Sequence, residues 1–459
     1  MLSLEEPIAA IATPPGVGGL AVIRVSGTNS ISLVSKIFKS KSDLNSAPTH
    51  TLHYGKILDK EDRVLDEVLI SLFHAPKSFT TQETVEISCH GGPVITQSIM
   101  NRLMEIGVRM AEPGEFTKRA FLNGRIDLSQ AESVSDLIHS TSQISQQSSL
   151  FQLSGIYSSN LKSIRQDLID FISLLELELD FSGEDVEFAS RDALISKLEE
   201  IILYVGKLTA SFSTGRFIKE GVRVVIAGKP NAGKSTLLNN LLGHDRAIVS
   251  EIAGTTRDTI EESANIEGIP FRFIDTAGIR ESSDFVEQRG VERTLKNIES
   301  ANLLLYLFDL SIGLTDVEKV QIENFKKKNQ ELKILLVGNK SDLVYEQSDF
   351  QYHNFEIVKI SASKNIEIES LYSWLKRMVL GNQSYGDATE AITNVRHYHA
   401  LVRVSENLKK SLEAVKKQIS QDFISSDIRA ALFELGSITG ETTTDDILNN
   451  IFSKFCIGK

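Results

Sequence analysis

The chain has little cysteine and no excess of positive charge. Its 459 residues include two cysteines, Cys89 and Cys456, and neither belongs to a C-x-x-C pair. A C-x-x-C zinc or redox motif is therefore excluded, and a reducing cytosol suits this composition. Lysine and arginine number 49 against 61 acidic residues, which gives a net charge of −12. This balance argues against a generally basic nucleic-acid-binding surface, although RNA can still bind a local patch or a partner protein.

Long apolar runs are missing as well. No stretch is both long enough and apolar enough to cross a bilayer. The first six residues carry two glutamates and no basic segment of a secretory signal. We therefore expect a cytoplasmic protein that does not bind membranes. Its length suggests about three domains, and at 41% hydrophobic residues it can bury sizeable cores.

The spacing of apolar residues changes along the chain and predicts four segments. Residues 1–120 combine strand candidates with one helical stretch, which indicates a mixed α/β domain. Within 121–215, and again within 381–459, apolar residues recur every three or four positions, as in long amphipathic helices. Because these helical segments flank 216–380, we expect that segment to be inserted into a single helical domain. The strand candidates of the first segment are Ile8–Ala12, Leu20–Val25, Val68–Phe73 and Thr84–Ser88.

A glycine-rich loop opens the third segment. Gly228-Lys-Pro-Asn-Ala-Gly-Lys234-Ser235 follows the apolar run Val222–Ala227 and precedes a helix-forming stretch that begins at Thr236. This G-x-x-x-x-G-K-S pattern lets backbone amides and a helix N-terminus face phosphate oxygens. Lys234 would reach the β- and γ-phosphates, and the Ser235 hydroxyl would bind Mg²⁺.

Two further loops fit a nucleoside triphosphate. The strand candidate Ile269–Ile274 leads into Asp275-Thr276-Ala277-Gly278. There the Asp275 carboxylate can hold Mg²⁺ through water, and the Gly278 amide can meet the γ-phosphate. The loop Gly254-Thr-Thr-Arg-Asp258 resembles a switch loop, in which we assign Thr256 to Mg²⁺.

The base is predicted to be guanine. Asn339-Lys340-Ser341-Asp342 follows an apolar strand candidate and matches the N-K-x-D pattern. Asn339 would contact the base edge, and Lys340 would pack along it. The Asp342 carboxylate would accept from the two N–H donors that guanine has and adenine lacks. Ser361-Ala362 resembles a weaker guanine-loop motif, although it could equally be a polar turn. Together the motifs resemble the translation-factor-like class of GTPases.

Over its whole length the chain resembles the MnmE (TrmE) family of tRNA-modification GTPases. The stretches that carry this resemblance are Ala12–Gly19, Cys89–Gly92, Pro113–Gly124, Asp127–Glu132, the switch at 254–258 and Phe455–Lys459.

The resemblance implies a fold and a set of partners. It implies an N-terminal tetrahydrofolate-binding domain (1–120) that forms a homodimer, a helical domain in two parts (121–215 and 381–459), and an inserted GTPase domain (216–380). It also implies a complex with the MnmG (GidA) protein, a heterotetramer or larger, in which FAD is bound by MnmG only. The pair would modify carbon 5 of the wobble uridine of certain tRNAs, with a one-carbon unit from 5-formyl- or methylene-tetrahydrofolate.

The resemblance also bears on GTP hydrolysis. Ile279 stands where Ras-like GTPases have a water-orienting glutamine, and the family points to Glu287 instead. An acidic, solvated helix face is the alternative reading of Glu287. K⁺ would replace an arginine finger, held by the Asn231 side chain and by a loop that contains Ser250, Ile252 and Thr255; a plain turn residue is the alternative for Asn231. The residues predicted to bind GTP are Asn231, Ala232, Gly233, Lys234, Ser235, Thr236, Ser250, Ile252, Thr255, Thr256, Asp275, Thr276, Ala277, Gly278, Asn339, Lys340, Asp342, Ser361 and Ala362.

The folate site is implied at four positions, Arg24, Glu83, Arg125 and Lys459. Arg24 could also be a solvated charge at a strand edge, and the family often has lysine where Arg125 stands. Cys456 is the thiol that the resemblance links to the chemistry, whereas a lone cysteine near a chain end can be incidental. Two other functions stay open: a regulatory GTPase of ribosome or RNA assembly, and a scaffold in which GTP gates a helical interface.

Overall fold

The computed structural model describes residues 5–180, 191–244, 261–274, 297–344, 352, 355–381 and 384–458. The chain forms two compact units. The first comprises Met1–Ile138, Gln152–Ile195 and Asn407–Lys459, and the second comprises His139–Phe151 and Ser196–Glu406. The predicted domain boundaries at 120, 215 and 380 remain proposals.

The first unit begins with a twisted sheet whose order is β3-β4-β5-β6-β2-β1-β7. Neighbouring strands pair antiparallel, except for β1 and β7, which pair parallel. Alternate residues of the central strands, such as Ile23, Ile70 and Ile87, are fully buried on one face. The strands are β1 (Ile8–Ile11), β2 (Gly18–Ser26), β3 (Phe38–Lys39), β4 (Thr51–Leu58), β5 (Val64–Phe73), β6 (Thr84–Gly91) and β7 (Arg109–Met110).

Helices complete the first unit. Two of them, α1 (Ser30–Ser35) and α2 (Pro93–Glu105), supply Ile31, Val34, Ile99 and Leu103 to the core beneath the sheet. The predicted mixed α/β character of this part is confirmed.

The last helix of the chain packs beside α3 (Glu115–Leu122) and α4 (Leu128–Ile138). This helix, α16 (Asp445–Phe452), supplies Phe452 to a cluster with Leu128 and Phe455. The C-terminal segment is therefore anchored to residues more than 300 positions earlier in the chain.

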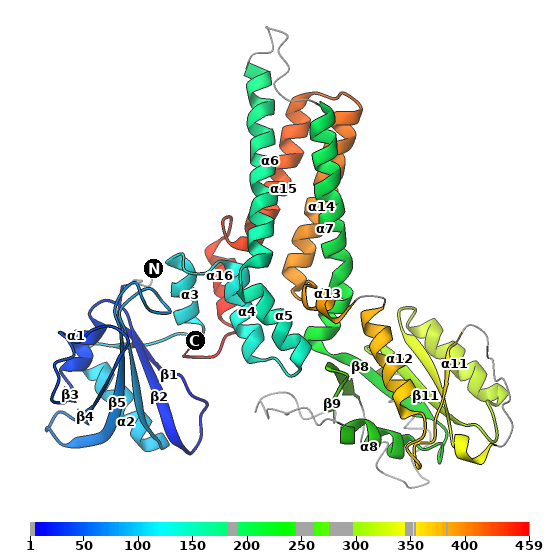
Figure 1. The fold of residues 1–459 in the computed structure, drawn as a ribbon, viewed down its shortest axis with the longest axis horizontal. Helices are drawn as coiled ribbons and strands as arrows, with labels where there is room; N and C mark the ends of the chain where they lie inside the picture. Colours follow the sequence, from blue (N-terminus) through cyan, green and yellow to red (C-terminus); the bar gives the residue numbers. More distant parts are fainter. Residues whose placement is uncertain are drawn as a thin grey trace. The chain divides into compact units, whose positions relative to one another are not determined.

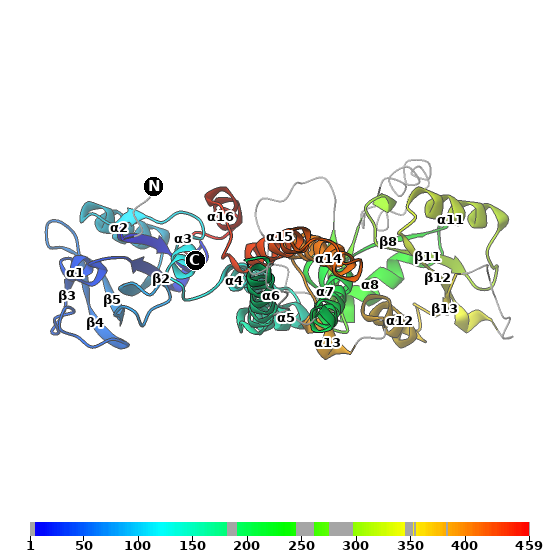
Figure 2. The ribbon, with the colours of Figure 1, turned by 90° about the horizontal axis from the view of Figure 1, so that it is seen from above.

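The predicted helical periodicity is also confirmed. Helices α6 (Ile156–Asp180) and α15 (Gln421–Thr439) lie side by side (Figures 1 and 2). Leu161, Leu168 and Leu175 recur at a spacing of seven residues and are buried on α6. The remaining helices outside the second sheet are α5 (Gln143–Leu153), α7 (Arg191–Glu220), α13 (Tyr385–Thr389) and α14 (Val395–Lys416).

The second unit contains a mainly parallel sheet of order β13-β12-β11-β8-β10-β9. Its one antiparallel pair among the described residues is the hairpin β9–β10. Strands β9 and β11 are additional to the predicted ones. The strands are β8 (Val222–Gly228), β9 (Glu262–Ile266), β10 (Ile269–Phe273), β11 (Leu303–Asp309), β12 (Lys333–Asn339) and β13 (Ile357–Lys359).

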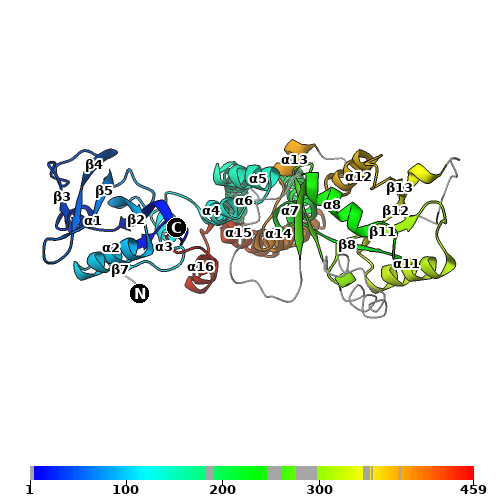
Figure 3. The same ribbon diagram turned by 90° about the horizontal axis from the view of Figure 1, so that it is seen from below.

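Helices cover both faces of this sheet, as a parallel sheet requires. Helix α11 (Asp316–Lys328) lies on the face opposite α12 (Ile368–Leu380), as Figures 2 and 3 show. The core under α12 also receives Leu237, Leu238 and Leu241 of α8 (Lys234–His244). The predicted fold class is thus confirmed: an N-terminal α+β part, an all-α part and a Ras-like phosphate-loop domain. No helix in the described ranges is long and apolar enough to cross a membrane.

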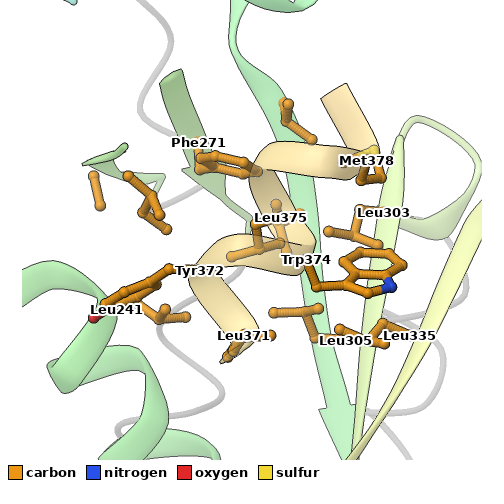
Figure 4. Close-up of a cluster of buried hydrophobic side chains, with 14 of the residues drawn as sticks. Leu241, Phe271, Leu303, Leu305, Leu335, Leu371, Tyr372, Trp374, Leu375 and Met378 are labelled. Atoms are coloured by element: carbon orange, nitrogen blue, oxygen red, sulfur yellow. The ribbon is translucent and has the colours of Figure 1, made fainter. Parts of the chain in front are cut away.

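Helix α12 offers a stability test. Its Leu375 is fully buried in the cluster that also contains Phe271 and Leu303 of the sheet (Figure 4), whereas Ser373 two residues away is exposed. We predict that Leu375→Ala lowers the free energy of unfolding of the second unit by about 3 kcal/mol, because it removes buried surface and leaves a cavity. Ser373→Ala should change it by less than about 0.5 kcal/mol. Denaturant titration measures both, and equal losses would contradict the packing.

Candidate functional site

The phosphate loop joins β8 to α8 in a conformation that needs its glycines. Gly228 and Gly233 have φ values of 142° and 100°. A Cβ at Gly228 would collide with the Leu307 carbonyl, and one at Gly233 would collide with the amide of Asn339. The loop therefore passes so close to β11 and to Asn339 of β12 that neither position has room for a side chain.

Lys234 is folded back onto this loop. Its Nζ donates to the carbonyl oxygens of Gly228 at 2.7 Å and Lys229 at 2.8 Å. Burial lowers the pKa of the Lys234 ammonium. Ser235 and Thr236 follow in the first turn of α8 and are exposed. The predicted Mg²⁺ ligand Ser235 thus lies at the helix N-terminus, beside the lysine.

A buried carboxylate anchors the start of the loop. Lys229 Nζ lies 3.2 Å from Glu318 Oε2 and donates to Thr315 Oγ1 at 3.0 Å. Glu318 is 3% exposed and closes a capping box with Thr315 at the start of α11. Burial raises the pKa of the Glu318 carboxyl, but bonds from Thr315 and Lys229 outweigh it and lower that pKa. Sequence reasoning missed this pair, although the T-x-x-E pattern signals a helix start.

Asn339 connects the phosphate loop to the guanine-loop motif. Its side chain donates to the Ala232 carbonyl at 2.7 Å and accepts from the Ala362 N–H at 2.9 Å. The residue is 4% exposed. The structure therefore brings together predicted residues from the phosphate loop, the N-K-x-D loop and the Ser361-Ala362 motif. Contact between Asn339 and the base stays a prediction. One N–H group and one oxygen lone pair of its side-chain amide are still available for that contact.

A second asparagine holds the same loop. Asn240, on α8, donates from Nδ2 to the Ala362 carbonyl at 2.7 Å. Ser361 is fully buried beside it and pairs with Ile366 through two backbone hydrogen bonds. Sequence reasoning did not single out Asn240, because nothing in the α8 sequence reveals a partner 122 residues later.

The N-K-x-D loop carries one ion pair. Lys340 Nζ lies 2.6 Å from Asp309 Oδ2 at the end of β11. Burial alone would raise the pKa of Asp309, but hydrogen bonds from Lys340 and Ser311 lower it overall. Asp342 lies in the short 3₁₀ helix Ser341–Leu343 and is exposed. Sequence reasoning missed Asp309 as well.

Several predicted residues lie outside the described ones, so the structure does not bear on them. They are Ser250, Ile252, Thr255, Thr256, Asp275, Thr276, Ala277, Gly278, Glu287 and Lys459.

Arg24 on β2, a predicted folate residue, bonds a neighbouring strand and the C-terminal segment. The Arg24 guanidinium donates from Nε to Glu86 Oε1 at 2.9 Å and from NH1 to the Gly458 carbonyl at 3.3 Å. It also lies over the Phe116 ring, 5.7 Å from the centroid. Arg24 is therefore a paired residue rather than a merely solvated charge, and it holds the C-terminal segment.

The end of the chain fits tightly against β1. Gly458 has a φ of 97°, and a Cβ there would lie 2.7 Å from the Ile11 carbonyl oxygen. The carbonyl of Cys456 accepts from Gly114 N at 3.4 Å, and the residue itself is exposed. Cys89, in contrast, is buried, and burial raises its thiol pKa to about 11. A reactive role therefore suits Cys456 better than Cys89.

Glu83 lies directly before β6, and Arg125 bonds a residue of the same segment, Ser78. Glu83 Oε2 accepts from Ile31 N at 3.3 Å. Arg125 donates to the Ser78 carbonyl, and its guanidinium lies 5.5 Å from the centroid of the Phe79 ring. Arg24, through Glu86, reaches the same stretch. Arg24 and Arg125 thus bond residues of the stretch 78–86, to which Glu83 itself belongs, and each of the three predicted folate residues has its own protein partner.

Two family descriptions together cover almost the whole chain. Residues 7–125 match the family described as GTP-binding protein TrmE N-terminus, and residues 128–456 match the MnmE helical domain. Among solved structures, Era in complex with MgGDPNP and a segment of 16S ribosomal RNA matches with 29% identity and a TM-score of 0.27, covering 40% of this chain and 66% of that chain.

Curated relatives match from end to end. The tRNA modification GTPase MnmE of Cytophaga hutchinsonii is 48% identical, over 99% of this chain and 98% of its own length. The proteins of that name from Christiangramia forsetii and Salinibacter ruber are 46% and 44% identical, each over 100% of both chains. This chain therefore belongs to the MnmE family of tRNA modification GTPases.

Proposed function

We propose that this protein couples GTP hydrolysis to modification of carbon 5 of the wobble uridine in certain tRNAs. The relatives carry the name tRNA modification GTPase. One observation supports GTP binding above all others. The Asn339 side chain bonds the phosphate loop at Ala232 and the guanine-loop motif at Ala362. One buried amide thus fixes the spacing of the two ends of a guanine-nucleotide site.

The geometry of the loop supports a GTP–Mg²⁺ complex. Glycines at 228 and 233 let the loop pack closely against Leu307 and Asn339, and α8 begins directly after it at Lys234. In the complex Lys234 would exchange its bonds to loop carbonyls for the phosphates. Ser235 and Thr256 would hold Mg²⁺, with Asp275 acting through water. The bound ion would neutralise charge on the β- and γ-phosphates.

Hydrolysis would depend on K⁺ and on Glu287. Asn231 is exposed at the tip of the phosphate loop, so its side-chain oxygen is accessible to an ion. Carbonyls of Ser250, Ile252 and Thr255 would complete the site. An ion there supplies positive charge where the transition state develops negative charge, as an arginine finger does. Glu287 would orient the attacking water, and pairing of two GTPase domains would order these loops.

The C-terminal segment supports a folate site in the first unit. Arg24 donates to the Gly458 carbonyl, which holds the segment that contains Cys456 beside β2. Arg24, Glu83, Arg125 and Lys459 would bind a 5-formyl- or methylene-tetrahydrofolate that supplies the one-carbon unit.

The partners follow from the same proposal. The N-terminal domain would form a homodimer, and the dimer would bind MnmG as a heterotetramer or larger complex. FAD would be bound by MnmG only, and tRNA would be the shared substrate. With a net charge of −12, this chain would contact tRNA through a local basic surface or through MnmG.

Base specificity gives the first test of this proposal. An asparagine at 342 presents one donor and one acceptor, so it loses the paired N–H bonds of guanine but can donate to the C2 carbonyl of xanthine. We predict that Asp342→Asn weakens GTP binding about 100-fold and strengthens XTP binding, as measured by calorimetry. If the variant still prefers GTP to XTP as the wild type does, Asp342 does not contact the base.

The cation gives the second test. The φ of Asn231 is 62°, a conformation that glycine adopts freely, so Asn231→Gly removes the side chain without straining the loop. We predict that wild-type protein hydrolyses GTP faster in KCl than in NaCl. Asn231→Gly should lower turnover in KCl by about 100-fold, with GTP affinity little changed. Equal wild-type rates in the two salts would contradict the role of K⁺.

Cells provide the third test. We predict that deleting the gene abolishes the wobble-uridine modification and that the wild-type gene restores it, as measured by mass spectrometry of tRNA. Arg24→Ala should fail to restore it, because the variant loses both the anchor of the C-terminal segment and a folate contact. Purified Arg24→Ala should bind 5-formyltetrahydrofolate about 10-fold more weakly.

The matched control is Arg63→Ala. Arg63 is an exposed arginine of the same unit that pairs with Asp59. This variant should restore modification fully. Unchanged modification in cells that lack the protein would instead favour a GTPase of ribosome or RNA assembly.

A further inference from the structure

Helix α8 spans the distance between the two ends of the nucleotide site. Lys234, at its first position, belongs to the phosphate loop, and Asn240 bonds the Ala362 carbonyl. Six helical residues at about 1.5 Å each separate them by about 9 Å along the axis. One rigid helix therefore links the phosphate end to the loop predicted to lie against guanine.

The Ala362 peptide group has both of its polar atoms held by side chains. Its N–H donates to Asn339 Oδ1 at 2.9 Å, and its carbonyl accepts from Asn240 Nδ2 at 2.7 Å. The methyl group of Ala362 packs in the same core as Leu237 and Leu241 of α8. Without Asn240 the carbonyl would lose its side-chain donor at the edge of that core, and the loop would be free to shift.

We propose that Asn240 is a positioning residue for guanine-nucleotide binding, acting through Ala362 without touching the phosphates. This role rests on the guanine-site assignment given above. It places a determinant of nucleotide affinity on α8, outside the N-K-x-D and Ser361-Ala362 motifs. The bond acts at the base end, so it affects GTP and GDP alike and leaves the step of phosphate cleavage unchanged.

The chain supplies a matched control in the preceding residue. Asn239 is also an asparagine of α8, but it is exposed, whereas Asn240 is half-buried. Substituting either by alanine makes the same chemical change on the same helix. Any difference between the two variants therefore reports the contact with Ala362 and not helix propensity.

The test measures affinity and turnover for the full-length protein. Asn240→Ala should raise the dissociation constants for GDP and for GTP by the same factor, about 3- to 10-fold. It should raise KM for GTP with kcat unchanged. Asn240→Asp, which has the same shape but cannot donate, should lose at least as much affinity, whereas Asn239→Ala should match the wild type.

Three results of the affinity and turnover measurements would overturn the proposal. These are equal affinities for the alanine variants at 239 and 240, a fall in kcat with affinity unchanged, and wild-type affinity in Asn240→Asp. Thermal midpoints measured without nucleotide serve as the folding control. If both Asn240 variants unfold in that measurement, the bond is purely structural and the proposal fails. If Asp342→Asn keeps its preference for GTP, the site assignment itself is wrong.

Discussion

The spacing of the nucleotide-site loops in the second unit depends on one buried side-chain amide. Asn339 lies at the carboxyl end of β12, where a parallel sheet opens toward its ligands. Its side chain is almost fully buried, so both of its polar atoms need partners. They bond Ala232 in the phosphate loop and Ala362 in the loop after β13. Two loops that are distant in sequence are thereby held at one spacing, and the glycine at 233 lets the amide approach.

Charged residues at the same edge of the sheet are also held by partners from neighbouring elements. Glu318 is buried and pairs with Lys229, and Asp309 pairs with Lys340. In each case a lysine of a nucleotide-site motif is held by an acid from a neighbouring element. Because a buried or half-buried charge must be paired, these acids restrict where the lysines can lie. Asn240 adds a neutral bond of the same kind from α8.

The first unit uses the same principle to fix the end of the chain. Arg24 has a carboxylate partner in Glu86 and an aromatic ring in Phe116, and its NH1 nitrogen donates to the Gly458 carbonyl. Phe455 adds apolar contact, and the glycine at 458 lets the segment lie against β1. The exposed Cys456 is thus placed beside the sheet instead of on a free tail.

Sequence alone determined the features that consecutive residues encode. The phosphate loop, the N-K-x-D loop and the apolar stripes of α6 and α15 depend on neighbouring residues and their period, so they could be predicted. Only the tertiary structure decided which polar groups meet. The bonds from Arg24 to Gly458 and from Asn240 to Ala362 join residues 434 and 122 positions apart. Local propensity and spacing carry no information about such pairs, because the packing of sheets and helices creates them.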